Sequence, residues 1–255
     1  VGVLVERTAK AVANAVTNRL KGEKRLVRPA VEPAVSEEAW LDLHAKMAAL
    51  RTPCNVSASS STPLVSVCLV HYNRPHLLLQ AVESLRKQDY PSFEVILVDD
   101  GSNLPEAKIC LDSLEEDFSA RGWRILRQPN RYLGAARNAA AKIAQGDFLM
   151  FMDDDNVAQP HELSKMVSAA LTSGADILTC FFRVFIGDEE PKIDTVFNVW
   201  LPLGGAASAG FFYNCFGDAN SLVKKSVFEE LGGFSEDYGL AFEDWEFFAK
   251  AVLRG

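Results

Sequence analysis

The sequence predicts an α/β protein with a doubly wound, mostly parallel sheet flanked by helices. The first observation is alternation: from Leu64 to about residue 180, short apolar runs alternate with amphipathic helical patterns, and only a few residues connect them. The second is the run 148–152, which is apolar without a break and is followed at once by three acids. Such a run is typical of a strand buried on both faces of a parallel sheet.

The expected elements follow one another in a regular order. Strands are predicted at 64–70, 93–98, 124–126, 148–152 and 176–180. Helices are predicted from Pro75 onward and at 105–118, 133–144, 161–173 and 243–253. We expect the strands that start at Leu64, Phe93 and Phe148 at the centre of the sheet. After Phe181 the alternation weakens, and 187–191 is predicted to form a turn between two edge strands.

Residues 1–63 differ from the rest of the chain. Apolar residues recur there at helical spacing, and a Ser-rich stretch at 52–63 follows them. We expect a helical arm and linker at 1–63, followed by one α/β domain at 64–255. The sequence is also expected to be a piece of a longer protein, because it stops directly after a helical pattern.

Composition and charge exclude several classes of protein. The net charge is −8 and no basic cluster is interleaved with aromatic residues, which argues against a nucleic-acid partner. No apolar run approaches the roughly 20 residues that a transmembrane helix needs. The five cysteines are scattered and predict neither a disulfide framework nor a zinc site. Scattered cysteines are explained most simply by a reducing compartment, so we predict a cytoplasmic protein. A location at the inner face of the membrane stays open as an alternative.

Three predicted strands end in polar side chains at the same edge of the sheet. Tyr72 follows the first strand, Asp100 the second, and Asp153, Asp154 and Asp155 the third. Ligands of open α/β sheets bind outside the carboxyl ends of the strands. Clustered carboxylates repel one another unless a cation neutralises them, and hard divalent cations with phosphate oxygens are a common solution. The pattern therefore suggests a nucleotide site with a metal.

A plain structural explanation exists for each of these features. The three acids are equally typical of an acidic loop before the next helix. Residues 99–102 have the composition of a β-turn, with Asp at its start and Gly within it. Tyr72 has the alternative of an ordinary half-buried aromatic residue.

Six short segments occur in a definite order within residues 64–254. They are Tyr72-Asn73-Arg74-Pro75, Asp99-Asp100-Gly101-Ser102, Gly134-Ala135-Ala136-Arg137-Asn138, Asp153-Asp154-Asp155, Gly232-Gly233-Phe234 and Glu243-Asp244-Trp245. The set resembles family 2 of the inverting glycosyltransferases, which have the Rossmann-like GT-A fold. Each segment alone is weak, but the set in this order is specific to the family.

The resemblance implies a site for a nucleotide-diphosphate sugar, most often a uridine one. Tyr72 would stack on the base, and Asp100 would accept a hydrogen bond from the N–H edge of the base. Asp155 would hold Mn²⁺ or Mg²⁺ on the diphosphate, with Asp153 as a further ligand. Asp153 or Asp154 would face the ribose and the waters of the metal.

The resemblance also assigns two residues on predicted helices. Arg137 would lie near the nucleotide; an ordinary surface arginine on a helix is the alternative. Asp244 would be the catalytic base that removes the proton from the acceptor hydroxyl. A carboxylate in the first turn of a helix is also favourable for the helix dipole, which leaves a structural role for Asp244 open.

The predicted function is metal-dependent, inverting transfer of a hexosyl or N-acetylhexosaminyl group from a nucleotide sugar to an acceptor hydroxyl. The expected acceptor is a carbohydrate or a lipid-linked sugar, in polysaccharide or glycoconjugate synthesis. Two alternatives stay open: a sugar-1-phosphate nucleotidyltransferase, and a nucleotide-binding domain that is catalytically incomplete. The first would need a glycine-rich phosphate loop after the first strand, and the sequence at 70–75 contains no glycine.

The segment 200–216 contains five aromatic residues among small ones. Apolar faces of sugar rings pack well on aromatic rings, so this segment could line an acceptor groove. Burial of the same rings against the sheet is the equally supported alternative.

Overall fold

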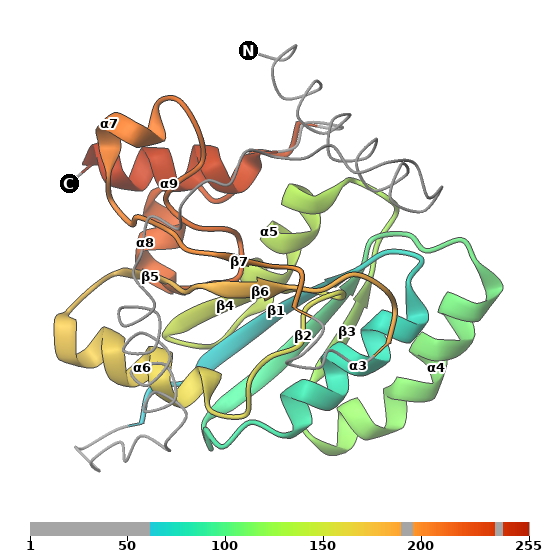
Figure 1. Cartoon of the computed structure of the whole chain (residues 1–255). Helices are drawn as coiled ribbons and strands as arrows, with labels where there is room; N and C mark the ends of the chain where they lie inside the picture. Colours follow the sequence, from blue (N-terminus) through green and yellow to red (C-terminus); the bar gives the residue numbers. More distant parts are fainter. Residues whose placement is uncertain (1–61, 190–195, 238–241, 255) are drawn as a thin grey trace, which may run out of the picture. The chain divides into compact units, whose positions relative to one another are not determined.

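Helices lie on both faces of a central sheet in the computed structural model, which describes residues 62–189, 196–237 and 242–254 (Figure 1). All of these residues belong to one compact unit. The helical arm and most of the linker predicted at 1–63 lie outside the described residues.

The predicted alternation of strands and helices is confirmed as far as β5, with small differences at the element ends. The elements are β1 (Val65–His71), α3 (Pro75–Arg86), β2 (Phe93–Asp99), α4 (Pro105–Ala120), β3 (Arg124–Arg127), α5 (Leu133–Ile143), β4 (Phe148–Asp153), α6 (Glu162–Ser173), β5 (Ile177–Thr179), β6 (Phe182–Val184), β7 (Asn198–Trp200), α7 (Ala207–Gly210), β8 (Ser221–Lys224), α8 (Lys225–Glu230) and α9 (Glu243–Arg254). Within the three described ranges, no helix is both long enough and apolar enough to cross a membrane.

The main sheet has the strand order β3-β2-β1-β4-β8-β5. Strands β1 to β4 pair in parallel, whereas β8 runs antiparallel to both β4 and β5. The prediction of a mostly parallel, doubly wound sheet is therefore confirmed, with β1, β2 and β4 as inner strands.

The two faces of the sheet carry separate hydrophobic cores. Alternate residues of a strand point to opposite faces. Val67 and Leu69 of β1 pack with side chains of α3, α4 and α6. Cys68 and Val70 pack on the other face with side chains of α5, α8 and α9. Burial on both faces explains why 67–70 of β1 and 148–152 of β4 are continuous apolar runs rather than alternating ones.

The short strands after β5 depart most from the prediction. β6 and β7 pair antiparallel, but they form a separate two-stranded sheet rather than an edge of the main one. The turn predicted between them falls partly outside the described residues. β8, α7 and α8 were not predicted, because elements of four to six residues give too little periodicity to recognise.

The pairing register of β1 with β2 and β4 aligns the carboxyl ends of these three strands at one edge of the sheet. Val70 lies opposite Asp153 of β4, and His71 lies opposite Asp99 of β2. The chain therefore leaves the sheet at Asp153, and the loops that follow β1, β2 and β4 meet at the same edge.

Candidate active site

Asp154 anchors the loop that follows β1. It is fully buried, and its carboxylate is hydrogen-bonded to His71 Nδ1 at 2.6 Å. The same carboxylate accepts the backbone N–H of Tyr72 at 3.3 Å and forms an ion pair with Arg74. A contact between Asp154 and ribose would require these partners to move, so the structure favours an internal role for this residue.

Asp155 is the most open of the three acids, since 43% of its side chain is exposed. Arg74 Nη1 lies 2.5 Å from its carboxylate. Burial raises the pKa of the Asp155 carboxyl, Arg74 opposes the rise, and the charges of Asp153 and Asp154 add to it. The repulsion among the three carboxylates is therefore relieved only in part by Arg74.

The oxygen ligands at this strand end fit one divalent cation bound together with a diphosphate. In the described ranges, no three acidic, histidine or cysteine side chains are arranged to hold a metal ion by themselves. Mg²⁺ in nucleotide sites commonly uses one or two carboxylates, and phosphate oxygens and waters complete its shell. Asp155 has an accessible carboxylate and incomplete charge compensation, so it fits the main ligand role. Asp153 fits a shared role only, because Arg137 already contacts both of its oxygens.

Arg137 on α5 joins two parts of the site. Its side chain is 3% exposed, and Nη2 donates to both oxygens of Asp153, at 2.8 and 3.0 Å. Nη1 donates to Glu243 at 2.5 Å. The alternative of a surface arginine is therefore wrong. A contact between Arg137 and the nucleotide stays a prediction, and both terminal nitrogens already have protein partners.

Asp100 holds the loop that precedes α5. Its carboxylate accepts hydrogen bonds from Gln128 Nε2 at 2.7 Å and from the backbone N–H groups of Arg131 and Tyr132, both at 2.9 Å. A carboxylate offers about four lone-pair sites, so these bonds leave roughly one for a base. The Asp99 side chain also accepts the backbone N–H of Ser102 at 3.1 Å.

Tyr72 presents an open ring at the edge of the site, with 42% of the residue exposed. The next residue, Asn73, has a positive φ of 56°. Its side-chain oxygen accepts the backbone N–H groups of Asn103 and Leu104, at 2.9 and 3.0 Å. The backbone beside Tyr72 is thus fixed to the loop after β2, while the residue itself stays exposed enough for a base to stack on its ring.

Asp244 lies in the first turn of α9, half-buried beside Trp245. Burial raises the pKa of its carboxyl, and the charges of Glu243 and Asp153 raise it further. The backbone N–H of Trp245, which donates to Asp244 at 2.7 Å, and the positive charge of Arg137 oppose the rise. The fold therefore brings Asp244 within electrostatic reach of the β4 end, about 90 residues earlier in the chain.

Asp218 is an acid of this site that the sequence did not reveal. It lies just before β8, whose antiparallel register sets Leu222 opposite Met150, so the chain before β8 runs beside the carboxyl end of β4. Burial raises the pKa of the Asp218 carboxyl to about 6, and the charges of Asp153 and Asp244 contribute to the rise. The sequence signal was weak, because one acid before a four-residue strand is too common to single out.

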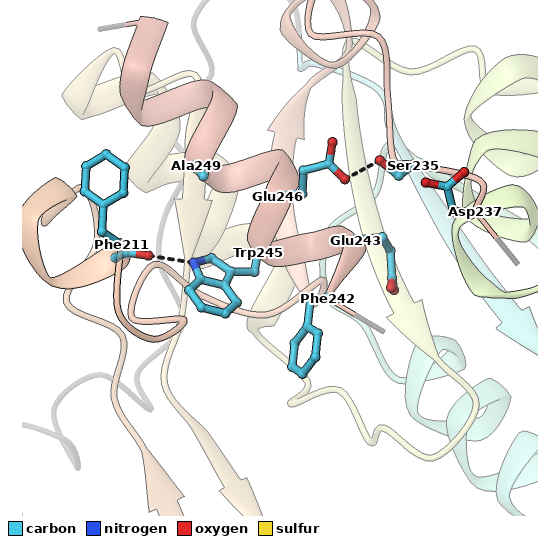
Figure 2. Close-up of a pocket in the computed structure, with 9 residues that line it drawn as sticks. Phe211, Ser235, Asp237, Phe242, Glu243, Trp245, Glu246 and Ala249 are labelled. Carbon is cyan, nitrogen blue, oxygen red and sulfur yellow. Dashed lines mark hydrogen bonds between the residues drawn. The ribbon is translucent and has the colours of Figure 1, made fainter. Parts of the chain in front are cut away.

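A cavity of about 440 Å³ lies between α7, α9 and the segment around Ser235 (Figure 2). Phe211, Phe242 and Trp245 line it together with acidic residues that include Glu243. The indole Nε1 of Trp245 donates to the carbonyl of Gly210 at 2.8 Å, which fixes the ring against α7. The cavity adjoins the start of α9, where Asp244 lies.

The aromatic segment 200–216 divides between the core and the surface. Phe216 is buried, which confirms the core alternative for that ring. Trp200 packs on Phe182 in the small sheet. Phe211 and Phe212 are 70% and 85% exposed, so a core position is wrong for these two.

Comparison with known proteins identifies the family. The model of the family described as "Glycosyl transferase family 2" matches residues 66–232, well over half of the chain. The chain belongs to glycosyltransferase family 2.

Curated relatives of this family 2 chain carry glycosyltransferase names. GlyG, described as a glycosyltransferase of Streptococcus pneumoniae, is 30% identical over 184 residues, which are 66% of this chain and 59% of GlyG. The O-antigen biosynthesis protein RfbC of Myxococcus xanthus is 30% identical over 211 residues, 76% of this chain and 16% of RfbC. The chain therefore spans less than two thirds of each relative.

Solved structures support the GT-A fold of this glycosyltransferase. S. aureus TarS 1-349 in complex with UDP-GlcNAc superposes with a TM-score of 0.58 at 22% identity, over 74% of this chain and 53% of that one. The mannosyltransferase PcManGT from Pyrobaculum calidifontis, in complex with GDP-Man and Mn2+, gives 0.55 at 20% identity, over 82% of this chain and 57% of that one. At 20% and 22% sequence identity, the likeness to these structures shows the fold alone.

Proposed function

We propose that this family 2 glycosyltransferase transfers a sugar from a uridine-diphosphate sugar to an acceptor hydroxyl, with metal dependence and inversion at the anomeric carbon. The observation that carries the proposal is the meeting of Asp153 and Asp244 around the buried Arg137, with Asp155 at the same strand end as Asp153. Two carboxylates that can hold a metal-bound diphosphate, Asp153 and Asp155, and a carboxylate that can accept a proton, Asp244, thus belong to one site. The proposed role is in polysaccharide or glycoconjugate synthesis.

The donor half of the proposed reaction uses the strand ends. The open ring of Tyr72 offers a stacking surface for the base, and the remaining lone pair of Asp100 can accept the N–H of uracil. Asp155, with Asp153 in a shared role, would hold Mn²⁺ or Mg²⁺ beside the diphosphate. The cation, when bound, supplies positive charge where the leaving phosphate oxygens become negative.

The acceptor half uses the start of α9. The bond from the acceptor oxygen to the anomeric carbon forms while the bond from that carbon to the diphosphate oxygen breaks. The proton of the acceptor hydroxyl passes to the carboxylate of Asp244. The raised pKa of Asp244 makes it a stronger base than an exposed aspartate, which favours this proton transfer.

The cavity beside α9 is the proposed acceptor site. Phe211 and Phe242 offer faces on which a sugar ring can pack, and the carboxylates can accept hydrogen bonds from sugar hydroxyls (Figure 2). Phe242 has a positive φ of 85°, a strained conformation for this residue type. Such strain is often found at ligand sites, where the surrounding structure holds the backbone in place.

A thermal-shift screen tests the donor half. UDP and Mn²⁺ together should raise the melting temperature more than either alone, because both bind only the folded state and share the diphosphate. Asp155→Asn should remove most of the Mn²⁺-dependent part of the shift. Asp112→Asn is the matched control, since Asp112 is an exposed aspartate whose arginine partner also lies at 2.5 Å.

The outcomes of the screen separate the possibilities. No shift with any nucleoside diphosphate would contradict the proposed donor site. Equal shifts with UDP, GDP and TDP would remove the uracil-specific role of Asp100. UDP binding without release of UDP from any UDP-sugar, in the longest available chain, would favour the catalytically incomplete domain instead.

A further inference from the structure

One face of α5 fastens the acceptor half of the site to the donor half. Residues 134, 137 and 138 share this face because they are three and four positions apart in a helix. Gly134 leaves no room for a side chain, since an added Cβ would lie 2.1 Å from the carbonyl oxygen of Ser235. Asn138 exchanges two hydrogen bonds with the backbone of Phe234, at 2.8 and 3.0 Å. The segment that leads toward α9 is thus held on α5.

Arg137 extends this attachment into the site itself. Its guanidinium bridges Asp153 at the end of β4 and Glu243 at the start of α9, residues that are 90 positions apart in the chain. The side chains of Arg137 and Glu243 are 3% and 7% exposed. A charge buried this deeply is stable only when it is paired, so loss of either partner leaves the other uncompensated.

Glu243 and its neighbour Asp244 face different surroundings. Adjacent residues of a helix point about 100° apart, so only one of them can turn toward Arg137 in this way. Glu243 takes that direction and accepts the hydrogen bond at 2.5 Å, while Asp244 is half-buried and accepts the backbone N–H of its neighbour Trp245. Glu243 is therefore placed to hold the helix, and Asp244 is left available for a substrate.

We propose that Arg137 and Glu243 are positioning residues that set the place of Asp244 relative to the carboxyl end of β4. Their ion pair fixes the first turn of α9 against Asp153, and so fixes the gap in which the transferred sugar lies between diphosphate and base. This inference rests on the proposed function. It assigns to Arg137 a task inside the protein in place of a direct contact with the nucleotide.

The bridge also controls the charge around Asp244. The groups that act on it from neighbouring elements are Arg137 on α5, Glu243 on α9, Asp153 on β4 and Asp218 before β8. A negative neighbour raises the pKa of a carboxyl and a positive neighbour lowers it. Loss of the Glu243 charge should therefore lower the pKa of Asp244, whereas Arg137→Lys keeps the positive charge.

The test compares three variants of the whole chain. Glu243→Gln keeps the shape of the side chain but removes its charge. Arg137→Lys keeps the charge but loses the fork that reaches both carboxylates. Glu230→Gln is the matched control, because it removes an exposed ion pair between α8 and the far end of α9, where Arg254 lies 2.6 Å away. UDP release from UDP-glucose and UDP-N-acetylglucosamine, with water as the acceptor, measures turnover, and calorimetry measures UDP affinity.

The two bridge variants should lower kcat by about 10- to 100-fold, the usual cost of a misplacement near 1 Å, while UDP affinity changes by less than about threefold. The acid limb of the kcat–pH profile should move to lower pH in Glu243→Gln and stay in place in Arg137→Lys. Glu230→Gln should match the wild-type chain in kcat, in UDP affinity and in the pH profile.

A merely structural role gives a different result. The melting temperature and the active fraction would then fall, while kcat per UDP-binding site and the pH profile would stay unchanged; that result overturns the inference. Turnover of both bridge variants equal to that of Glu230→Gln overturns it as well. Absence of UDP binding and turnover in the wild-type chain would instead contradict the proposed function, so the two failures are distinguishable.

Discussion

The two sides of the candidate site are built in different ways. On the strand-end side the charged groups are already paired within the protein: Asp154 is fully buried between His71 and Arg74, and Asp100 accepts three hydrogen bonds. On the α7–α9 side, large apolar side chains such as Phe211 face solvent around an open cavity.

This difference indicates which region of the site can tolerate substitutions and which cannot. A site made from the ends of packed parallel strands cannot change shape without disturbing the core, so it suits a donor with one constant part, the nucleoside diphosphate. A site made from loops and exposed rings can change by single substitutions at little cost to stability. Acceptor preference is therefore expected to depend on the second region.

The largest effect is expected at Asp244, and it distinguishes the two regions because turnover and UDP affinity should respond differently. Asp244→Asn removes the proposed base, so UDP release from a UDP-sugar should fall by roughly two to four orders of magnitude. UDP affinity in the presence of Mn²⁺ should stay near wild type, because the proposed donor contacts lie on the strand ends. Turnover near the wild-type rate would make the base assignment wrong, and Glu243 would then need to be tested as the base.

A smaller effect is expected from the exposed ring of Phe211. Phe211→Ala should raise the KM for a carbohydrate acceptor by about threefold to tenfold, the usual worth of one stacking contact, and leave UDP affinity unchanged. Ile109→Ala is the control, since Ile109 on α4 is equally exposed but does not line the cavity. Equal KM values for the two variants would remove Phe211 from the acceptor site.

The last prediction concerns stability rather than turnover, at Asp218. Its folded-state pKa of about 6 lies above the unfolded value, so its contribution to stability is present below about pH 4 and is lost as the pH rises through 6. Asp218→Asn removes this loss, and urea unfolding should show a gain of up to about 3 kcal/mol over wild type at pH 7 but none near pH 4. Asp112→Asn, at an exposed position on α4, is the control and should show no gain at pH 7; an equal gain for both variants would contradict the buried charge at Asp218.

Much of the strand-end side of the candidate site could be predicted from the sequence because the signals there are local. The unbroken apolar run of β4 and the acids after it identify both a buried strand and the point at which the chain leaves the sheet. Parallel pairing then brings the residues after β1, β2 and β4 to one edge without further information.

The partners of the charged residues could not be predicted in this way. The pairing of Arg137 with Glu243 joins positions 106 residues apart, and it depends on how α9 docks on α5. Asp218 enters the site through β8, an antiparallel strand of four residues that gives almost no periodic signal. Contacts of this kind follow from tertiary packing, which overrides local patterns.

A crystal structure of the chain with UDP and Mn²⁺, with the manganese located by its anomalous scattering, tests the central claim most directly. We expect manganese in contact with the Asp155 carboxylate and the diphosphate, with Arg74 displaced from Asp155 and the uracil ring against Tyr72. Manganese or uracil bound elsewhere, such as in the cavity between α7 and α9, would contradict the assignment of the strand ends as the donor site.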